Sequence, residues 1–436
     1  MRDGPAFPKE WLRQPIYDLA TWTNGLAFRD FQFSPSGWPV IKIAELKEGV
    51  TEQTRFTRQT FEDRYHVKHG DMLFSWSGNP DTSIDVFWWR WGDGWLNQHI
   101  FKVEPTDVDT RYFYYLLRYL RPAFAEIARN KQTTGLGHVT MEDLKALPVG
   151  VPPLGLQRGI GEVLGSLDDK IELNRRMNQT LEDLCRALFK FWFVDFGPVR
   201  AKKEGRWKKG QCLPGMPADM WDLWPSEFEE SEIGEIPKGW KVGPVSSVVD
   251  INPERRLVRG EAAPYVEMGR LPTSAARVTG FVARAFASGS RFRNGDTLVA
   301  RITPCLENGK TAFVDFLPDG QVGWGSTEFL VLSPKRPLPT QWPYLLARTE
   351  DFRTHLIQNM TGTSGRQRAP AECLDSFFVT VPSLEVAVRF SSVVAPWFES
   401  MKRSDDESIT LASARDALLP KLLSGEIRVR QNDGGG

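Results

Sequence analysis

The sequence has no long apolar run. No stretch of its 436 residues approaches the roughly 20 apolar residues that a membrane-spanning helix needs. Its start also lacks the basic segment, apolar stretch and small-residue cleavage site of a secretory signal. We therefore expect a cytoplasmic protein with no membrane partner.

Cysteine is scarce. The four cysteines lack the spacing of a metal site or of a disulfide framework, and they are Cys185, Cys212, Cys305 and Cys373. Isolated thiols of this kind in a cytoplasmic protein are normally reduced. We expect all four to be reduced and inert.

The formal net charge is zero, because 55 Lys and Arg residues balance 55 Asp and Glu residues. A zero balance argues against a protein that binds nucleic acid or acidic membranes through a uniformly basic surface. The proportions of apolar residues (41%) and charged residues (25%) are those of an ordinary globular protein. At roughly 150 residues per domain, the length allows about three domains.

Active-site motifs are missing as well. Residues 309–311 (Gly-Lys-Thr) resemble the end of a phosphate-binding loop, but Pro304 stands where the first glycine is needed. His66 and His69 have no third metal ligand at a suitable spacing. No glycine-rich loop after a strand offers a site for S-adenosylmethionine. We therefore predict a non-catalytic chain that binds no metal and no cofactor of its own.

An internal repeat organises the chain. Residues 151–154 (Val-Pro-Pro-Leu) recur 230 residues later as 381–384 (Val-Pro-Ser-Leu). Residues 70–73 (Gly-Asp-Met-Leu) resemble 295–298 (Gly-Asp-Thr-Leu), 225 residues later. The small change in offset indicates short loop insertions. The sequence is therefore a tandem duplication of a unit of roughly 200 residues.

Each copy begins with a mixed part, at about 1–150 and at 232–380. Short β-prone runs such as 86–91 and 329–332 alternate with turns rich in Gly, Pro and Asn. A helix-like stretch follows in each copy. These parts are predicted to be compact α+β domains.

Each copy ends in a segment with a heptad pattern. Residues spaced four and three apart start at Ile160, and the positions shifted by 230 start at Phe390. Such a pattern predicts two long helices that pair along a seam. The predicted seam comprises Ile160, Leu164, Leu167, Ile171, Asn174, Asn178, Leu181, Cys185, Leu188 and Trp192, with Phe390, Val394, Trp397, Met401, Ser404, Ser408, Leu411, Arg415, Leu418 and Leu422 in the second copy.

The centre of this seam is polar. Asn174 and Asn178 correspond to Ser404 and Ser408. Polar seam residues lower stability but help to fix register, so we interpret them as a partner-selecting device. The alternative is an amphipathic helix that packs only on its own domain. Pro396 interrupts the second stripe and predicts that the helix bends or restarts there.

Two segments have no assigned chemistry. Residues 196–231 are interpreted as a linker between the copies, because a basic run is followed by an acidic run, and most such runs are solvated surface. Residues 428–436 are expected to be a disordered tail.

Arginine is concentrated in the second copy. Between residues 255 and 301, nine arginines accompany three acidic residues. Arginine pairs in two-point geometry with phosphate or with the O6/N7 edge of guanine, which lysine does less selectively.

A loop rich in Gly, Thr and Ser lies at 361–368, with a counterpart at 132–138. Its small residues let backbone amides approach an anion, and its Gln, Arg and His can read base edges. A plain structural turn is the alternative. The candidate DNA-binding residues are Arg55, Arg58, Lys68, Gln132, Thr133, His138, Arg255, Arg256, Arg270, Arg291, Arg293, Arg301, Thr363, Arg366 and Arg368.

Residues 157–195 resemble the central conserved region of the specificity subunits of type I restriction-modification systems. The resemblance rests on 167–176 (Leu-Asp-Asp-Lys-Ile-Glu-Leu-Asn-Arg-Arg) and on 187–196 (Ala-Leu-Phe-Lys-Phe-Trp-Phe-Val-Asp-Phe). Residues 233–240 resemble the usual start of the second target-recognition domain, and 418–427 resemble the distal conserved region. The resemblance covers nearly the whole chain.

This resemblance implies an α+β fold class, with two tandem α/β target-recognition domains separated by two long helices that pack as an antiparallel coiled coil. The implied recognition domains are 1–154 and 232–384. The implied helices are 155–195 and 385–427. A helix over 160–192 would be about 48 Å long, enough to hold two readers about one duplex turn, roughly 34 Å, apart.

In that family each recognition domain reads one half of a bipartite DNA target, and the helices set the spacer and dock the modification subunits. The resemblance therefore implies double-stranded DNA, two modification (methyltransferase) subunits and restriction/translocase subunits as partners. S-adenosylmethionine, ATP and Mg are expected on those partners and not on this chain. The alternatives are a coiled-coil adaptor that binds only proteins and a self-sufficient adenine methyltransferase, which the missing motifs disfavour.

Overall fold

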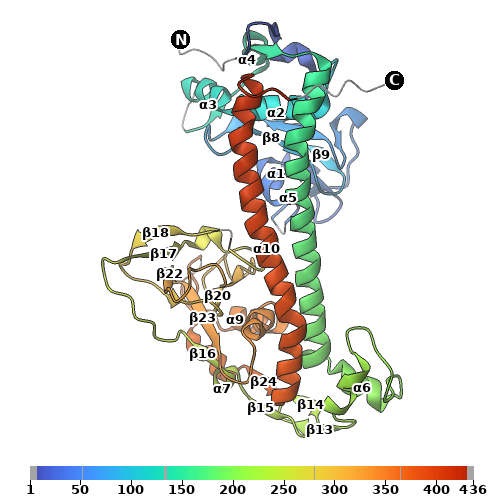
Figure 1. Cartoon of the computed structure of the whole chain (residues 1–436), viewed down its shortest axis with the longest axis vertical. Helices are drawn as coiled ribbons and strands as arrows, with labels where there is room; N and C mark the ends of the chain where they lie inside the picture. The colour runs from blue at the N-terminus through green and yellow to red at the C-terminus, as the bar shows by residue number, and fades with distance from the viewer. Residues whose placement is uncertain (1–6, 52, 132–134, 279, 364, 430–436) are drawn as a thin grey trace. The chain divides into compact units, whose positions relative to one another are not determined.

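The structure is a computed structural model that describes residues 7–51, 53–131, 135–278, 280–363 and 365–429. The chain divides into two units (Figure 1). Unit 1 comprises Met1–Ile171 and Ile409–Gly436, and unit 2 comprises Glu172–Ser408. Within the described ranges, we find no helix with the length and apolar character needed to cross a membrane.

Unit 1 is built on two four-stranded sheets. One has the order β2 (Ala20–Asn24), β10 (Ile100–Pro105), β6 (Met72–Ser75) and β8 (Asp85–Trp88). The other has the order β4 (Phe56–Thr57), β3 (Trp38–Ile41), β9 (Gly94–Leu96) and β5 (His66–Val67). Two short antiparallel pairs complete the strands: β1 (Leu12–Pro15) with β12 (Pro148–Val151), and β7 (Ser77–Gly78) with β11 (Gly137–His138).

Apart from parts of the two long helices, the α-helices described in unit 1 are α1 (Ile43–Glu48), α2 (Thr110–Tyr119), α3 (Arg121–Asn130) and α4 (Met141–Ala146). α2 lies against β8 and β10 of the first sheet, whereas α1 contacts β3 of the second. Asp109 starts α2 because its carboxylate accepts a hydrogen bond from the backbone N–H of Tyr112 at 2.9 Å. The ring of Tyr114 on α2 stacks on Trp88 of β8, with centroids 5.0 Å apart. The buried face of α2 therefore packs on the sheet.

Unit 2 repeats this strand order. Its first sheet is β16 (Val249–Ile251), β23 (Phe329–Pro334), β20 (Thr297–Ala300) and β21 (Thr311–Phe313). Its second is β18 (Val282–Ala285), β17 (Ala262–Val266), β22 (Gly323–Gly325) and β19 (Arg291–Phe292), and β15 (Lys241–Pro244) pairs with β24 (Phe378–Val381). The one parallel contact of each second sheet is also shared, β3 with β9 and β17 with β22. The shared topology agrees with the internal repeat.

Outside the long pair and residues 196–231, the α-helices described in unit 2 are α7 (Val245–Val248), α8 (Gln341–Ala347) and α9 (Glu350–Gln358). α8 lies against β20, β21 and β23. Its Trp342 and Tyr344 are almost fully buried and belong to the same apolar core as Phe390. The core of unit 2 therefore joins its sheet to the long helices.

The two heptad segments form the two long helices that the sequence predicts. They are α5 (Leu154–Phe189) and α10 (Leu384–Leu423), and Figure 1 draws each as one uninterrupted helix. A π-helical turn, Lys190–Val194, follows α5 and contains Trp192.

Within each unit, α5 and α10 run in opposite directions where they contact each other. In unit 2, Asn174 meets Ser404, whereas Phe189 meets Phe390. In unit 1, Asp168 pairs with Arg415. The helices are therefore antiparallel where they touch, and the residues of the predicted seam are all buried or half-buried.

α10 is continuous through Pro396, so the expected restart there is wrong, whereas the expected bend stays a prediction. A proline leaves the carbonyl four residues earlier, here that of Ser392, without its helical donor. Pro396 is on the exposed side of the helix, where water can bond that carbonyl. The side chains of Val394 and Phe398, on either side of the proline, are buried in the unit 2 core and hold the helix there.

Residues 196–231, expected to be solvated, are folded as part of unit 2. They form α6 (Gly197–Lys203), a 3-10 helix (Ala218–Leu223) and β13 (Phe228–Ser231), which pairs with β14 (Gly234–Pro237). Trp207 and Trp224 are buried in the unit 2 core. The expectation rested on the charged residues, most of which do lie exposed, and not on the aromatic residues that build the core. In the predicted disordered tail, 430–436 lies outside the described residues.

Candidate nucleic-acid interface

The end of the first sheet is built in the same way in both units. In unit 1, β10 and β6 are in register with Ile100 opposite Ser75, and one residue further on the N–H of Trp76 donates to the carbonyl of His99 at 3.3 Å. In unit 2, Phe329 is opposite Ala300, and the N–H of Arg301 donates to the carbonyl of Glu328 at 3.0 Å. Trp76 and Arg301 therefore occupy equivalent positions.

A third segment joins each of these ends. The N–H of Val139 donates to the carbonyl of Trp76 at 2.8 Å, and the N–H of Ala369 donates to the carbonyl of Arg301 at 2.9 Å. The residues that precede them are His138 and Arg368. We define the sheet-end cluster of unit 1 as Trp76, His99 and His138, and the sheet-end cluster of unit 2 as Arg301, Glu328 and Arg368.

The sheet-end cluster of unit 2 is ionic. The carboxylate of Glu328 accepts from Arg368 at 2.7 Å and lies 3.4 Å from the Nε atom of Arg301. The three side chains are partly open to solvent, with 28% of Arg301, 18% of Glu328 and 43% of Arg368 exposed. The cluster thus presents two guanidinium groups held by one acid.

The sheet-end cluster of unit 1 is aromatic. The ring of Trp76 lies 5.7 Å from that of His99 and 5.8 Å from that of His138. His138 Nδ1 is 3.0 Å from the hydroxyl of Ser77. Burial, together with the neighbouring His138, lowers the pKa of His99 from its ordinary value, so His99 is neutral at neutral pH. This cluster has no guanidinium group.

The loop at 361–368 borders the ionic cluster. It is closed by two backbone hydrogen bonds between Thr361 and Arg368, at 2.8 and 2.9 Å. Gly362 and Gly365 adopt positive φ angles, which other residues rarely adopt. Thr363 and Arg366, both candidate DNA-binding residues, lie exposed at its tip. In the counterpart loop, Gln132 and Thr133 lie outside the described residues.

Several of the other candidate arginines are engaged within unit 2. Arg255 is largely buried and pairs with Asp296, which is 1% exposed, at 3.2 Å. Arg291 donates to the backbone carbonyl of Arg255 at 2.6 Å. Arg270 lies 3.4 Å from Glu267. The placement of Arg255 favours a structural role over the DNA contact expected from the sequence.

Arg256 and Arg293 are exposed and remain available as predicted. The DNA-binding role of every candidate stays a prediction.

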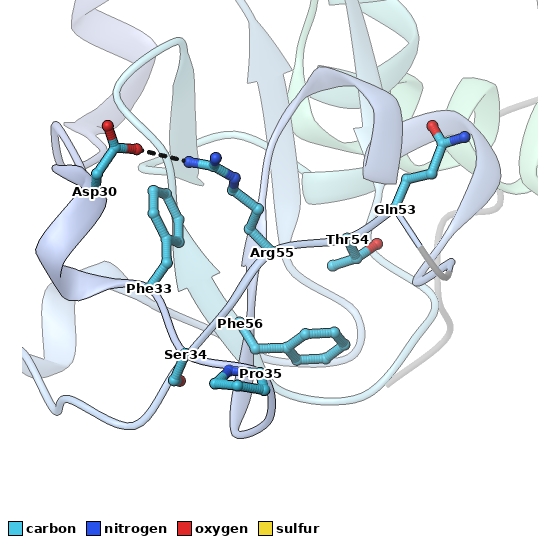
Figure 2. Close-up of a pocket in the computed structure, with 8 residues that line it drawn as sticks. All are labelled: Asp30, Phe33, Ser34, Pro35, Gln53, Thr54, Arg55 and Phe56. Carbon is cyan, nitrogen blue, oxygen red and sulfur yellow. Dashed lines mark hydrogen bonds and ion pairs between the residues drawn. The ribbon is translucent and has the colours of Figure 1, made fainter. Parts of the chain in front are cut away.

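His138 is the one unit 1 candidate that belongs to the sheet-end cluster. Arg55, Arg58 and Lys68 precede the cluster in the sequence, and Arg55 lines a cavity of about 560 Å³. Figure 2 shows the Arg55 guanidinium beside Asp30, to which it donates at 3.0 Å, and over the ring of Phe33 at 4.4 Å. Arg58 donates to the hydroxyl of Ser36 at 2.8 Å. Lys68 is exposed.

The described residues contain no cluster of three His, Cys, Asp or Glu side chains that could hold a metal ion. Burial raises the pKa of the Cys185 thiol to about 12, so that this thiol is not a nucleophile at neutral pH. The candidate interface is therefore built of polar, aromatic and guanidinium groups.

Each unit also fixes its globular domain on the long helices through one tyrosine, which sequence reasoning missed. In unit 1, the hydroxyl of Tyr115 donates to Asp168 on α5 at 2.6 Å, and Arg415 on α10 pairs with the same carboxylate. Tyr344, 229 residues later, is its counterpart in unit 2. The repeat offset was the signal that could have found the pair.

In unit 2 the acid that binds this tyrosine comes from α5. The hydroxyl of Tyr344 donates to Glu182, and Arg348 donates to Tyr344 at 2.9 Å and lies 3.5 Å from Glu182. Arg348 and Glu182 are 7% and 2% exposed. The guanidinium of Arg348 also donates to four backbone carbonyl groups, those of Thr273, Ala275, Gly309 and Thr311.

Comparisons with known proteins show which proteins this chain resembles. A family model described as "Type I restriction modification DNA specificity domain" matches residues 8–183. The chain is 25% identical over 357 residues to the type I restriction enzyme HindI specificity subunit of Haemophilus influenzae, which covers 70% of this chain and 74% of that protein. It is 23% identical over 347 residues to the MjaIX specificity subunit of Methanocaldococcus jannaschii, which covers 77% of this chain and 73% of that protein.

The chain is thus similar, over most of its length, to the specificity subunits of type I restriction-modification systems. The family resemblance carried by residues 157–195 is thereby confirmed. A crystal structure of a type I restriction-modification S subunit from M. genitalium aligns with 97% of this chain and 99% of that chain, at a TM-score of 0.49 and 15% identity.

The family model and both relatives are named for DNA specificity, and this similarity supports DNA sequence specificity as the function. Sequence reasoning missed three members of the sheet-end clusters, Trp76, His99 and Glu328. The signal was again the repeat, because residues 70–73 and 295–298 lead directly into Trp76 and Arg301.

Proposed function

We propose that this chain is a specificity subunit that reads a bipartite DNA target, with the globular domain of each unit reading one half. The observation that carries the proposal is the duplicated sheet end, where the same three backbone segments present different side chains in the two units. A duplicated scaffold with different side chains at one edge is suited to reading two different short sequences. Phosphate contacts would position each domain, and base contacts would specify the sequence.

The subunit acts in this proposal as a non-catalytic part of a cytoplasmic complex. Its partners are double-stranded DNA, two modification subunits that methylate adenine, and restriction/translocase subunits. S-adenosylmethionine, ATP and Mg belong to those partners. The balanced charge of the chain suits this arrangement, because partner subunits supply part of the grip on the DNA.

The long helices set the spacer between the half-sites and dock the modification subunits. Both α5 and α10 contribute residues to both units. Their exposed apolar residues, Leu173, Met177 and Leu184 on α5 and Ile409 on α10, are candidates for contacts with the modification subunits.

The test uses the full chain assembled with its modification subunits. The complex is incubated with duplexes that contain two randomised segments separated by spacers of several lengths, and the bound fraction is sequenced at two salt concentrations. We expect two short preferred sequences at one spacer length, with the preference kept as salt weakens overall affinity. Binding without sequence preference at either salt concentration would contradict the proposal.

A further inference from the structure

The sheet-end cluster of unit 2 has a property that its fold does not require. In unit 1, the same strand register and the same backbone hydrogen bonds form around Trp76, His99 and His138. The backbone of this sheet end therefore folds without any ionic group at these positions. Partly exposed ion pairs also contribute little to stability, so the charges at Arg301, Glu328 and Arg368 call for another explanation.

We infer that Arg301, Glu328 and Arg368 form a base-reading site that selects a G·C pair in the half-site read by unit 2. This inference rests on the proposed function and assigns residues to it. Arginine donates two parallel hydrogen bonds to O6 and N7 of guanine, the commonest specific protein–DNA contact, and a Glu carboxylate accepts from N4 of cytosine. The cluster carries both kinds of group side by side.

The geometry of Glu328 serves this role. Its carboxylate binds Arg368 and lies within ion-pair distance of Arg301, which limits the rotamers of two long side chains before DNA arrives. Each guanidinium has five N–H donors, so donors remain after the contact with Glu328. A side chain held in place loses less conformational entropy on binding.

The neighbouring loop supplies the complementary contact. Thr363 and Arg366 are exposed at the tip of the loop that Arg368 closes. A hydroxyl and a guanidinium at this place suit phosphate oxygens, which fix register without reading sequence. Base-reading and phosphate-binding groups thus lie on adjoining segments of unit 2.

The experiment compares variants of the full chain assembled with its modification subunits. Two variants, Arg301→Ala and Arg368→Ala, each remove one guanidinium from the cluster. A third, Arg368→Lys, keeps the positive charge but loses the two-point geometry. The matched control is Arg336→Ala, because Arg336 is exposed and follows β23 at its far end, about 20 Å along the strand from Glu328.

Each complex selects DNA from the randomised bipartite library, and the bound sequences are counted. The wild-type complex is expected to select G·C at one or more positions of the unit 2 half-site. Each cluster variant is expected to lower the preference at one such position by about 5- to 150-fold and to leave the other half-site unchanged. The control is expected to select the wild-type sequence.

The retained half-site also reports folding, since a variant that still selects it is assembled and active in binding. Unchanged G·C preference in all three cluster variants would overturn the inference, and so would an equal loss at every position in the variants and the control. If an alanine variant binds no DNA, the selection with Arg368→Lys decides the question, because this variant keeps a positive charge beside Glu328. Absence of any selected sequence with the wild-type complex would instead refute the proposed function itself.

Discussion

Unit 1 and unit 2 share strand order, register and the tyrosine that fixes the domain on the long helices, yet they differ in where their charges lie. Unit 2 places ionic groups at the sheet end and buries the Glu182–Arg348 pair beneath Tyr344. Unit 1 places aromatic rings at the sheet end, and the Asp168–Arg415 pair beside Tyr115 is less deeply buried. The two units therefore kept the same backbone topology after duplication, while the side chains at these positions diverged in chemistry.

The largest expected effect comes from the buried pair of unit 2. Arg348→Ala should lower the free energy of unfolding by about 3–5 kcal/mol, because it leaves the Glu182 carboxylate buried without its partner. Arg415→Ala in unit 1 should cost clearly less, since the side chain of Asp168 is 15% exposed and that of Glu182 only 2%. Denaturant titrations followed by circular dichroism measure both.

The pH dependence gives a further check on the same variant. Burial already raises the pKa of Glu182 above its ordinary value of 4.5 despite Arg348 nearby. A folded-state pKa above the unfolded one means that stability falls as the pH rises through the interval between them. The loss of unfolding free energy in Arg348→Ala should therefore be larger at pH 8 than at pH 5. Adding Glu182→Gln to this variant should restore part of the loss. Equal costs for Arg348→Ala and Arg415→Ala would remove this difference between the units.

A smaller effect is expected at the polar part of the helix pair, which lies in unit 2. The amide of Asn174 donates to the carbonyl of Ser404 at 3.2 Å and to the carboxylate of Glu407 at 2.8 Å. Asn174→Ala should cost about 1–3 kcal/mol, because it removes the hydrogen bonds that this buried amide donates to α10. The exposed neighbour Thr180→Ala is the control and should change stability by less than about 0.5 kcal/mol. A cost for Asn174→Ala no larger than that of the control would show that the polar seam does not stabilise the pair.

An effect of comparable size but opposite sign is expected at Pro396. The helix is continuous through this exposed proline, so Pro396→Ala should supply the missing N–H without altering the packing. We expect a gain of up to about 3 kcal/mol in unfolding free energy, read as a rise in the denaturation midpoint. A fall in the midpoint would mean that the proline is needed where it stands.

The sequence predicted the elements that follow from periodicity. The heptad spacing located α5 and α10, because this pattern lies within one segment of the chain. The offsets of 225 to 230 residues indicated a duplicated domain, because short motifs such as 151–154 remain similar in both copies. The ion pair of Arg255 could not be predicted, since its partner Asp296 lies 41 residues away in the chain. Pairing across that distance depends on the tertiary fold.

The sheet-end clusters show the same limit. Their members align at three different offsets: 225 for Trp76 and Arg301, 229 for His99 and Glu328, and 230 for His138 and Arg368. The repeat of residues 70–73 at 295–298 leads only to the first pair, and unlike side chains at other offsets give no sequence signal for the other two pairs. Only strand register shows that they are equivalent, and register is a property of the folded sheet.

The central claim is that the two sheet ends are equivalent positions that read different bases. The most direct test is to graft the cluster of unit 2 onto unit 1 with Trp76→Arg, His99→Glu and His138→Arg, and to map the adenines methylated by the assembled complex. The account predicts that the half-site read by unit 1 gains a preference for G·C at one position while the other half-site and the spacer stay the same. An unchanged set of methylated sites, or a change confined to the half-site of unit 2, would contradict it.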